Sequence, residues 1–119
     1  MDEFTAFAGF GLHLVIWLCF GLVSVIGSRP GGTRNAWAGI RIPALMKSDQ
    51  AWVVGHKAAI HHVRLGVLSL VPPAVIVIFF VGSAPQVVGW LEWALAAASL
   101  VWILVATKSA AHAAELVHS

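Results

Sequence analysis

The segment FTAFAGFGLHLVIWLCFGLVSVIG, residues Phe4–Gly27, decides the fold class of this chain. It holds 24 residues without a Lys, Arg, Asp or Glu, and His13 and Cys19 are its only titratable side chains. About 20 apolar residues are enough for a helix to cross the ~30 Å hydrocarbon core of a bilayer. A cleaved signal peptide has a basic start and a shorter apolar run of roughly 7–15 residues, and this N-terminus has neither feature. We therefore expect a retained membrane-spanning helix.

Two further apolar runs follow, at about residues 65–82 and 87–107, and Glu92 is the only charged residue within them. The whole chain has 119 residues, of which 60% are hydrophobic and 10% charged. A soluble domain carries about 25% charged residues, so lipid is the expected solvent. Backbone groups in lipid must bond within their own segment, which leaves the helix as the only state for three spans. The sequence thus predicts an all-α membrane protein that forms one three-span domain over residues 1–119.

The basic residues predict the orientation of the three spans. Six lie between spans one and two and the seventh follows span three: Arg29, Arg34, Arg41, Lys47, Lys57, Arg64 and Lys108. Loops rich in Lys and Arg stay in the cytoplasm. We therefore expect the N-terminus outside, and the loop 28–64 and the C-terminus inside.

The sequence of the loop 28–64 predicts lipid contacts at its start and a helix in its second half. Arg29 and Arg34 follow the first span and are expected to meet anionic lipid headgroups, each contributing about 1 kcal/mol. Pro43 favours an extended residue before it. Ser48 has the residue type and position of a helix N-cap, and the apolar periodicity that follows predicts an amphipathic helix over about 49–63. We expect this helix to lie along the inner membrane surface and to lead into span two.

Several residues of this loop form a pattern with a distinctive spacing. They are Asn35, Gly39, Ile40, Arg41, Pro43, Ser48, Trp52 and His56. This pattern resembles the signature of the SdpI family of small bacterial membrane proteins. The resemblance implies a multi-pass protein of the bacterial plasma membrane without enzymatic activity. The characterised role in that family is immunity to a secreted peptide toxin, coupled to holding a transcriptional repressor at the membrane. Immunity members are longer, so this chain resembles a minimal version.

The residues themselves allow two interpretations of that signature. Arg41, Ser48, Trp52 and His56 either lock the loop against the ends of the spans or form a binding surface for a partner. Locking is the simpler interpretation, because polar residues near a membrane need hydrogen-bond partners in any case.

Two ionisable residues, His13 and Glu92, lie inside predicted spans, where such groups are costly and usually paired or functional. Both are expected in the outer half of the membrane, facing the bundle interior or a partner, and interacting directly or through one water. Alternatively, Glu92 reaches the outer headgroups while His13 bonds a backbone carbonyl. Pro72 and Pro73 remove two backbone donors in the middle of span two and predict a helix bend, which either lines a pathway or only fits the packing of its neighbours.

Six histidines raise the question of a metal site, but their spacing does not form a ligand set. His112 and His118 are expected in a flexible C-terminal tail. We expect no metal, no cofactor, no nucleic-acid partner and no enzyme activity. The expected function is binding to other integral membrane proteins, as an accessory or scaffold subunit or in toxin immunity and signalling. The alternatives are a small proton or ion carrier that uses His13, Glu92 and the bent second span, and a lipid-binding module that uses the basic loop.

Overall fold

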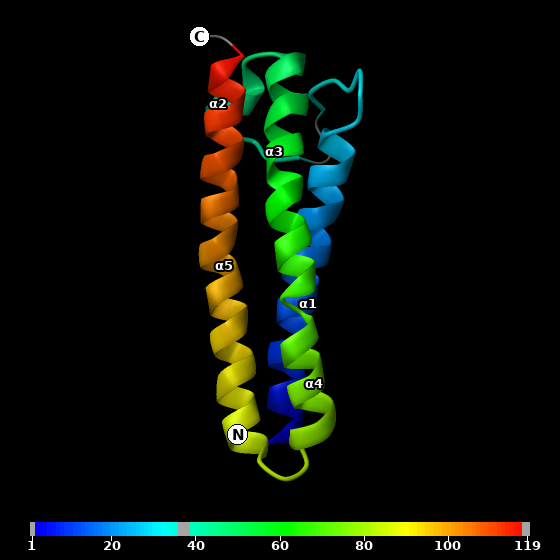
Figure 1. The fold of residues 1–119 in the computed structure, drawn as a ribbon, viewed down its shortest axis with the longest axis vertical. Coiled ribbons are helices and arrows are strands. Elements are labelled where there is room, and N and C mark those ends of the chain that lie inside the picture. Colours follow the sequence, from blue (N-terminus) through cyan, green and yellow to red (C-terminus); the bar gives the residue numbers. More distant parts are fainter. Residues whose placement is uncertain (1, 36–38, 118–119) are drawn as a thin grey trace. The chain divides into compact units, whose positions relative to one another are not determined.

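The computed structural model describes residues 2–35 and 39–117, and within those ranges it contains helices and no strand (Figure 1). The helices are α1 (Glu3–Gly27), α2 (Pro43–Met46), α3 (Asp49–Leu68), α4 (Val71–Phe80) and α5 (Pro85–Leu116). Three helical stretches are long and apolar enough to cross a membrane: Glu3–Gly27, Asp49–Phe80 and Pro85–Leu116. The prediction of an all-α chain with three candidate membrane-spanning helices is confirmed.

The helix ends differ in two places from those expected. The helix α3 begins at Asp49 but runs without a break through Leu68, so residues 49–63 and the start of the second span share one helix. The helix α5 continues to Leu116 and includes His112, which was expected in a flexible tail. The stretch beyond residue 107 is rich in alanine, the strongest helix former, so the helix outlasts its apolar run. His118 lies outside the described residues.

The chain divides into two compact units. The first unit contains residues 1–18 and 65–102, and the second contains residues 19–64 and 103–119. Each holds one of the two candidate sites described below.

In the first unit, α1 packs against both α4 and α5. A small core forms from Ala6, Val77, Val81 and Val88, with Phe10 and Ile76 packed against it. The start of α5 lies parallel to α1, because Gly9 approaches Glu92 while Trp17, two turns later, bonds Ser99. The two helices pack closely at Gly9, where an added Cβ would lie only 3.1 Å from the Cβ of Glu92. Small residues allow helices in lipid to approach in this way.

The N-terminus of α1 is capped by Asp2. The hydroxyl of Thr5 donates to Asp2 Oδ1 over 2.6 Å, and the Thr5 backbone N–H donates to the same oxygen over 2.8 Å. These two bonds, the hydroxyl first, lower the pKa of the exposed Asp2 carboxyl below its usual value. The indole Nε1 of Trp93 donates to the Thr5 carbonyl over 2.9 Å and ties this helix start to α5.

The second span is interrupted at Ser69 and Leu70, three residues before Pro72 and Pro73, respectively. A proline ring clashes with the carbonyl four residues earlier, so Pro72 and Pro73 act on Leu68 and Ser69 and end α3 there. The same prolines then lie in the first turn of α4, where a missing N–H costs no hydrogen bond. The interruption therefore precedes the prolines by one turn instead of lying at them.

Candidate functional site

The loop signature of the second unit is built around the buried imidazole of His56. Its Nε2 accepts a hydrogen bond from the Ile40 backbone N–H over 2.8 Å, and its Nδ1 lies 2.7 Å from the Trp52 carbonyl oxygen. An N–H must meet an acceptor and a carbonyl must meet a donor, so the proton of a neutral imidazole is on Nδ1. His56 thus satisfies one backbone group of the loop and one of α3.

Two glycines leave room for this arrangement. Gly39 has a φ of +139°, and a Cβ there would lie 2.2 Å from the ring of Trp52. Gly27, at the end of α1, would place a Cβ 2.2 Å from the His56 ring. The rings of Trp52 and His56 are themselves 4.4 Å apart between centroids. Gly39 is one of the signature residues predicted from the sequence, whereas Gly27 was expected only to end a span.

Two basic residues of the loop, Arg34 and Arg41, have partners within the protein. The Arg41 guanidinium donates to the carbonyl of Asn35. Arg34 donates from its Nε to Asp49 Oδ1 over 2.9 Å and from a terminal nitrogen to the Met46 carbonyl over 2.7 Å. Arg34 was expected at lipid headgroups, and its pairing with Asp49, fifteen residues further along the chain, was not predicted from the sequence.

The entry into α3 follows its expected local chemistry. Ser48 Oγ accepts from the Ala51 N–H over 3.0 Å, which confirms the predicted N-cap. Pro43 begins the short helix α2, and Ile42 before it is extended. The signature residues therefore contact one another and the neighbouring backbone, which is the geometry of a lock on the loop. Arg29 is exposed at the other end of the loop.

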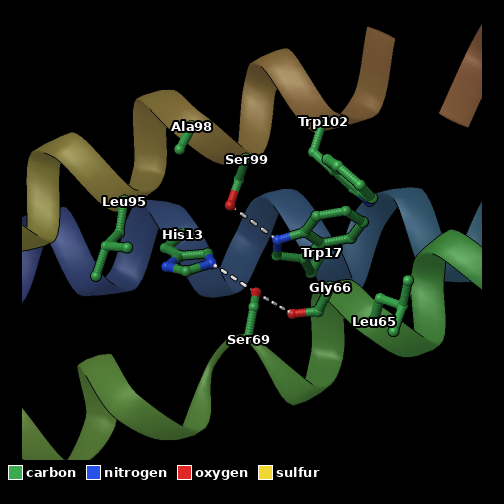
Figure 2. A pocket seen from close by; sticks show the side chains of 9 residues that line it. All are labelled: His13, Trp17, Leu65, Gly66, Ser69, Leu95, Ala98, Ser99 and Trp102. Carbon is green, nitrogen blue, oxygen red and sulfur yellow. Dashed lines mark hydrogen bonds between the residues drawn. The ribbon is translucent and has the colours of Figure 1, made fainter. Parts of the chain in front are cut away.

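The first unit contains a cavity of about 210 Å³ (Figure 2). It is lined by His13, Trp17, Leu65, Gly66, Ser69, Leu95, Ala98, Ser99 and Trp102. The indole Nε1 of Trp17 donates to Ser99 Oγ over 2.9 Å, and the ring of Trp17 lies directly against Gly66, where a Cβ would come within 2.1 Å. The walls are mostly apolar, and the polar side chains His13, Ser69 and Ser99 come from α1, from the turn after α3 and from α5.

His13 and Glu92 are both buried in this unit, with exposed fractions of 1% and 0%. The buried Glu92 side chain does not extend outward as it would to reach the headgroups. His13 contacts a hydroxyl group instead of a backbone carbonyl, because its Nε2 lies 3.4 Å from Ser69 Oγ. Within the described residues, His13 Nδ1 and both Glu92 oxygens have no hydrogen-bond partner. A direct hydrogen bond between the two side chains is therefore not formed, although both face the interior.

The described residues contain no group of three or more His, Cys, Asp or Glu side chains that could hold a metal ion. Compared with protein-family models, with curated proteins and with solved structures, the chain shows no match. Membership of the SdpI family stays a prediction from the loop residues.

Proposed function

We propose that this chain is a non-enzymatic, SdpI-like protein of the bacterial plasma membrane that acts by binding other integral membrane proteins. One observation supports this proposal above others: the signature residues use their hydrogen bonds within the second unit, while large apolar side chains face outward. The most exposed of these are Phe4, Leu68, Ile78, Phe79 and Leu104. Such surfaces meet lipid or the helices of a partner, and interfaces between helices in lipid need no polar signature.

The role of that binding is either an accessory or scaffold subunit of a larger complex, or toxin immunity and signalling. Purification at native expression level in a mild detergent tests the first role. A subunit co-purifies with a larger complex at fixed stoichiometry, and the tagged complex in turn retrieves this chain. A chain that purifies alone, and whose expression does not protect cells from any secreted peptide toxin, would contradict the proposal.

The proposed orientation has the N-terminus outside and the loop 28–64 and the C-terminus in the cytoplasm. In this orientation Arg29 meets anionic headgroups of the inner leaflet. Single cysteines at Asp2 and Glu115, in a chain with Cys19→Ser, test it with an impermeant thiol label applied to intact cells. The cysteine at position 2 should react and that at position 115 should not. The reverse pattern would refute the orientation.

A small proton or ion carrier is the second candidate, and the complete burial of Glu92 in the unit that also contains the interrupted part of the second span favours it. Acidic side chains inside membrane bundles often mark ion or proton pathways. A carrier should dissipate a pH gradient in liposomes and lose this activity with Glu92→Gln. Glu3→Gln is the matched control, because Glu3 is an exposed carboxylate in the same unit. Liposomes that keep their gradient with the wild-type protein would exclude this function.

A further inference from the structure

The first unit has very few groups that can carry charge. Residues 2–18 and 65–102 contain no Lys and no Arg, and their acidic and histidine side chains are Asp2, Glu3, His13 and Glu92. Asp2 and Glu3 are exposed and can be solvated. Only His13 and Glu92 are buried within the helices, and only His13 can become a cation there.

Glu92 needs a proton or a positive neighbour. Neither of its oxygens accepts a hydrogen bond from any residue that the structure describes, and no atom of the side chain reaches the surface of the protein. An ionised carboxylate buried without partners is so costly that such a group is neutralised instead. Neutralisation in this unit has two routes: a proton on Glu92 itself, or a proton on His13.

His13 has a vacant position for that proton. The single hydroxyl hydrogen of Ser69 is donated to the Gly66 carbonyl over 2.5 Å, so Ser69 can only accept from His13 Nε2 (Figure 2). The neutral imidazole therefore carries its hydrogen on Nε2, and Nδ1 keeps a lone pair. That nitrogen is buried and has no partner among the described residues.

Glu92 approaches Gly9, which precedes His13 by one helical turn on α1, where α1 is in close contact with α5. Gly9 lies directly against Glu92, because a Cβ added at Gly9 would be 3.1 Å from the Cβ of Glu92. His13 follows Gly9 by four residues, or about 6 Å along the helix axis. The unprotonated Nδ1 of His13 and the unpartnered carboxyl group of Glu92 thus lie along the same contact between α1 and α5.

We propose that His13 and Glu92 form one buried site that binds a single proton. In one form the proton is on the Glu92 carboxyl and the imidazole is neutral. In the other form the proton is on His13 Nδ1, which gives a carboxylate and an imidazolium within the same unit. Both forms hold the same number of protons and leave the first unit without a net buried charge. The inference deepens the carrier candidate but does not require transport, since a proton can be held without crossing the membrane.

Nuclear magnetic resonance of the full chain in lipid nanodiscs tests this site, with labels on the Glu carboxyl carbons and the His ring nitrogens. At neutral pH the wild-type spectrum should show either a carboxylic acid with a neutral imidazole, or a carboxylate with an imidazolium. Two results would overturn the proposal. A carboxylate together with a neutral imidazole would mean that the site binds no proton, and a carboxylic acid together with an imidazolium would mean that it binds two. This measurement needs no variant, so misfolding cannot obscure it.

Two substitutions then test whether the residues act as a pair. With Glu92→Gln, His13 should be neutral with its hydrogen on Nε2; with His13→Ala, Glu92 should be a carboxylic acid. Glu3→Gln and His61→Ala change exposed side chains and should leave both signals as in the wild type. An imidazolium in Glu92→Gln or an ionised Glu92 in His13→Ala, at the same pH, would show that the groups are independent. If the proton is found but the liposomes keep their gradient, the site stands and the carrier function falls.

Discussion

Replacing Gly66 by alanine should destabilise the first unit through one contact. The added Cβ would lie 2.1 Å from Trp17 Cε3 and 2.2 Å from Cδ2. Carbon atoms pack at about 3.5–4.0 Å, so the indole or the helix must move by roughly 1.4 Å or more. The indole is 1% exposed and is held by its hydrogen bond to Ser99, so it has little freedom to move.

The size of the effect follows from three contributions. Overpacking a tight interior costs about 1–3 kcal/mol, and a Trp17 N–H separated from Ser99 costs about 1–3 kcal/mol more. The greater helix propensity of alanine offsets about 1 kcal/mol. The net loss of unfolding free energy should therefore be about 3 kcal/mol, within a range of roughly 1–5 kcal/mol.

Thermal or denaturant unfolding in one mild detergent measures this change. The matched control is Gly11→Ala on α1, because a Cβ at Gly11 meets nothing within 4 Å. That variant should gain up to about 1 kcal/mol of stability, which is opposite in sign. Trp17→Leu combined with Gly66→Ala should cost less than the sum of the two single changes, because the smaller side chain relieves the clash. If Gly66→Ala unfolds at or above the wild-type temperature, the close contact between Gly66 and Trp17 is wrong.

Two further predictions concern the second unit. His56→Ala leaves the Ile40 N–H without its acceptor and opens a cavity, so it should cost about 2–4 kcal/mol in denaturant unfolding, while His61→Ala, an exposed change, should stay within about 0.5 kcal/mol. Equal stability of those two variants would contradict the lock. Arg34→Ala breaks an exposed ion pair with Asp49 and a hydrogen bond to the Met46 carbonyl, so it should lower the unfolding free energy by about 1 kcal/mol. Arg29→Ala should lower it by less than about 0.5 kcal/mol. If Arg34→Ala loses no more stability than Arg29→Ala in the same assay, the pairing of Arg34 contributes nothing.

Local features of the chain were predictable from the sequence because their causes are local. A run of apolar residues without charges forces a helix once lipid is the solvent, so Phe4–Gly27 predicted α1 within one residue. Ser48 caps α3 through an N–H only three residues away. The C-terminal end of α5 was predicted too short, because hydropathy marks where lipid ends and not where alanine-rich helix ends.

The sequence by itself determined that the chain is helical, that three of its stretches are apolar enough to span a membrane, and which residues in them are unusual. Only the tertiary structure decided which of these residues meet. His56 gains its partner Ile40 from a loop sixteen residues away, Arg34 gains Asp49, and Trp17 gains Ser99 from another helix. Glu92 illustrates the difference most clearly, since its position near a span end allowed escape to the headgroups. The close approach of α5 to Gly9 buries it instead, because helix faces pack by the fit of side chains that are distant in sequence.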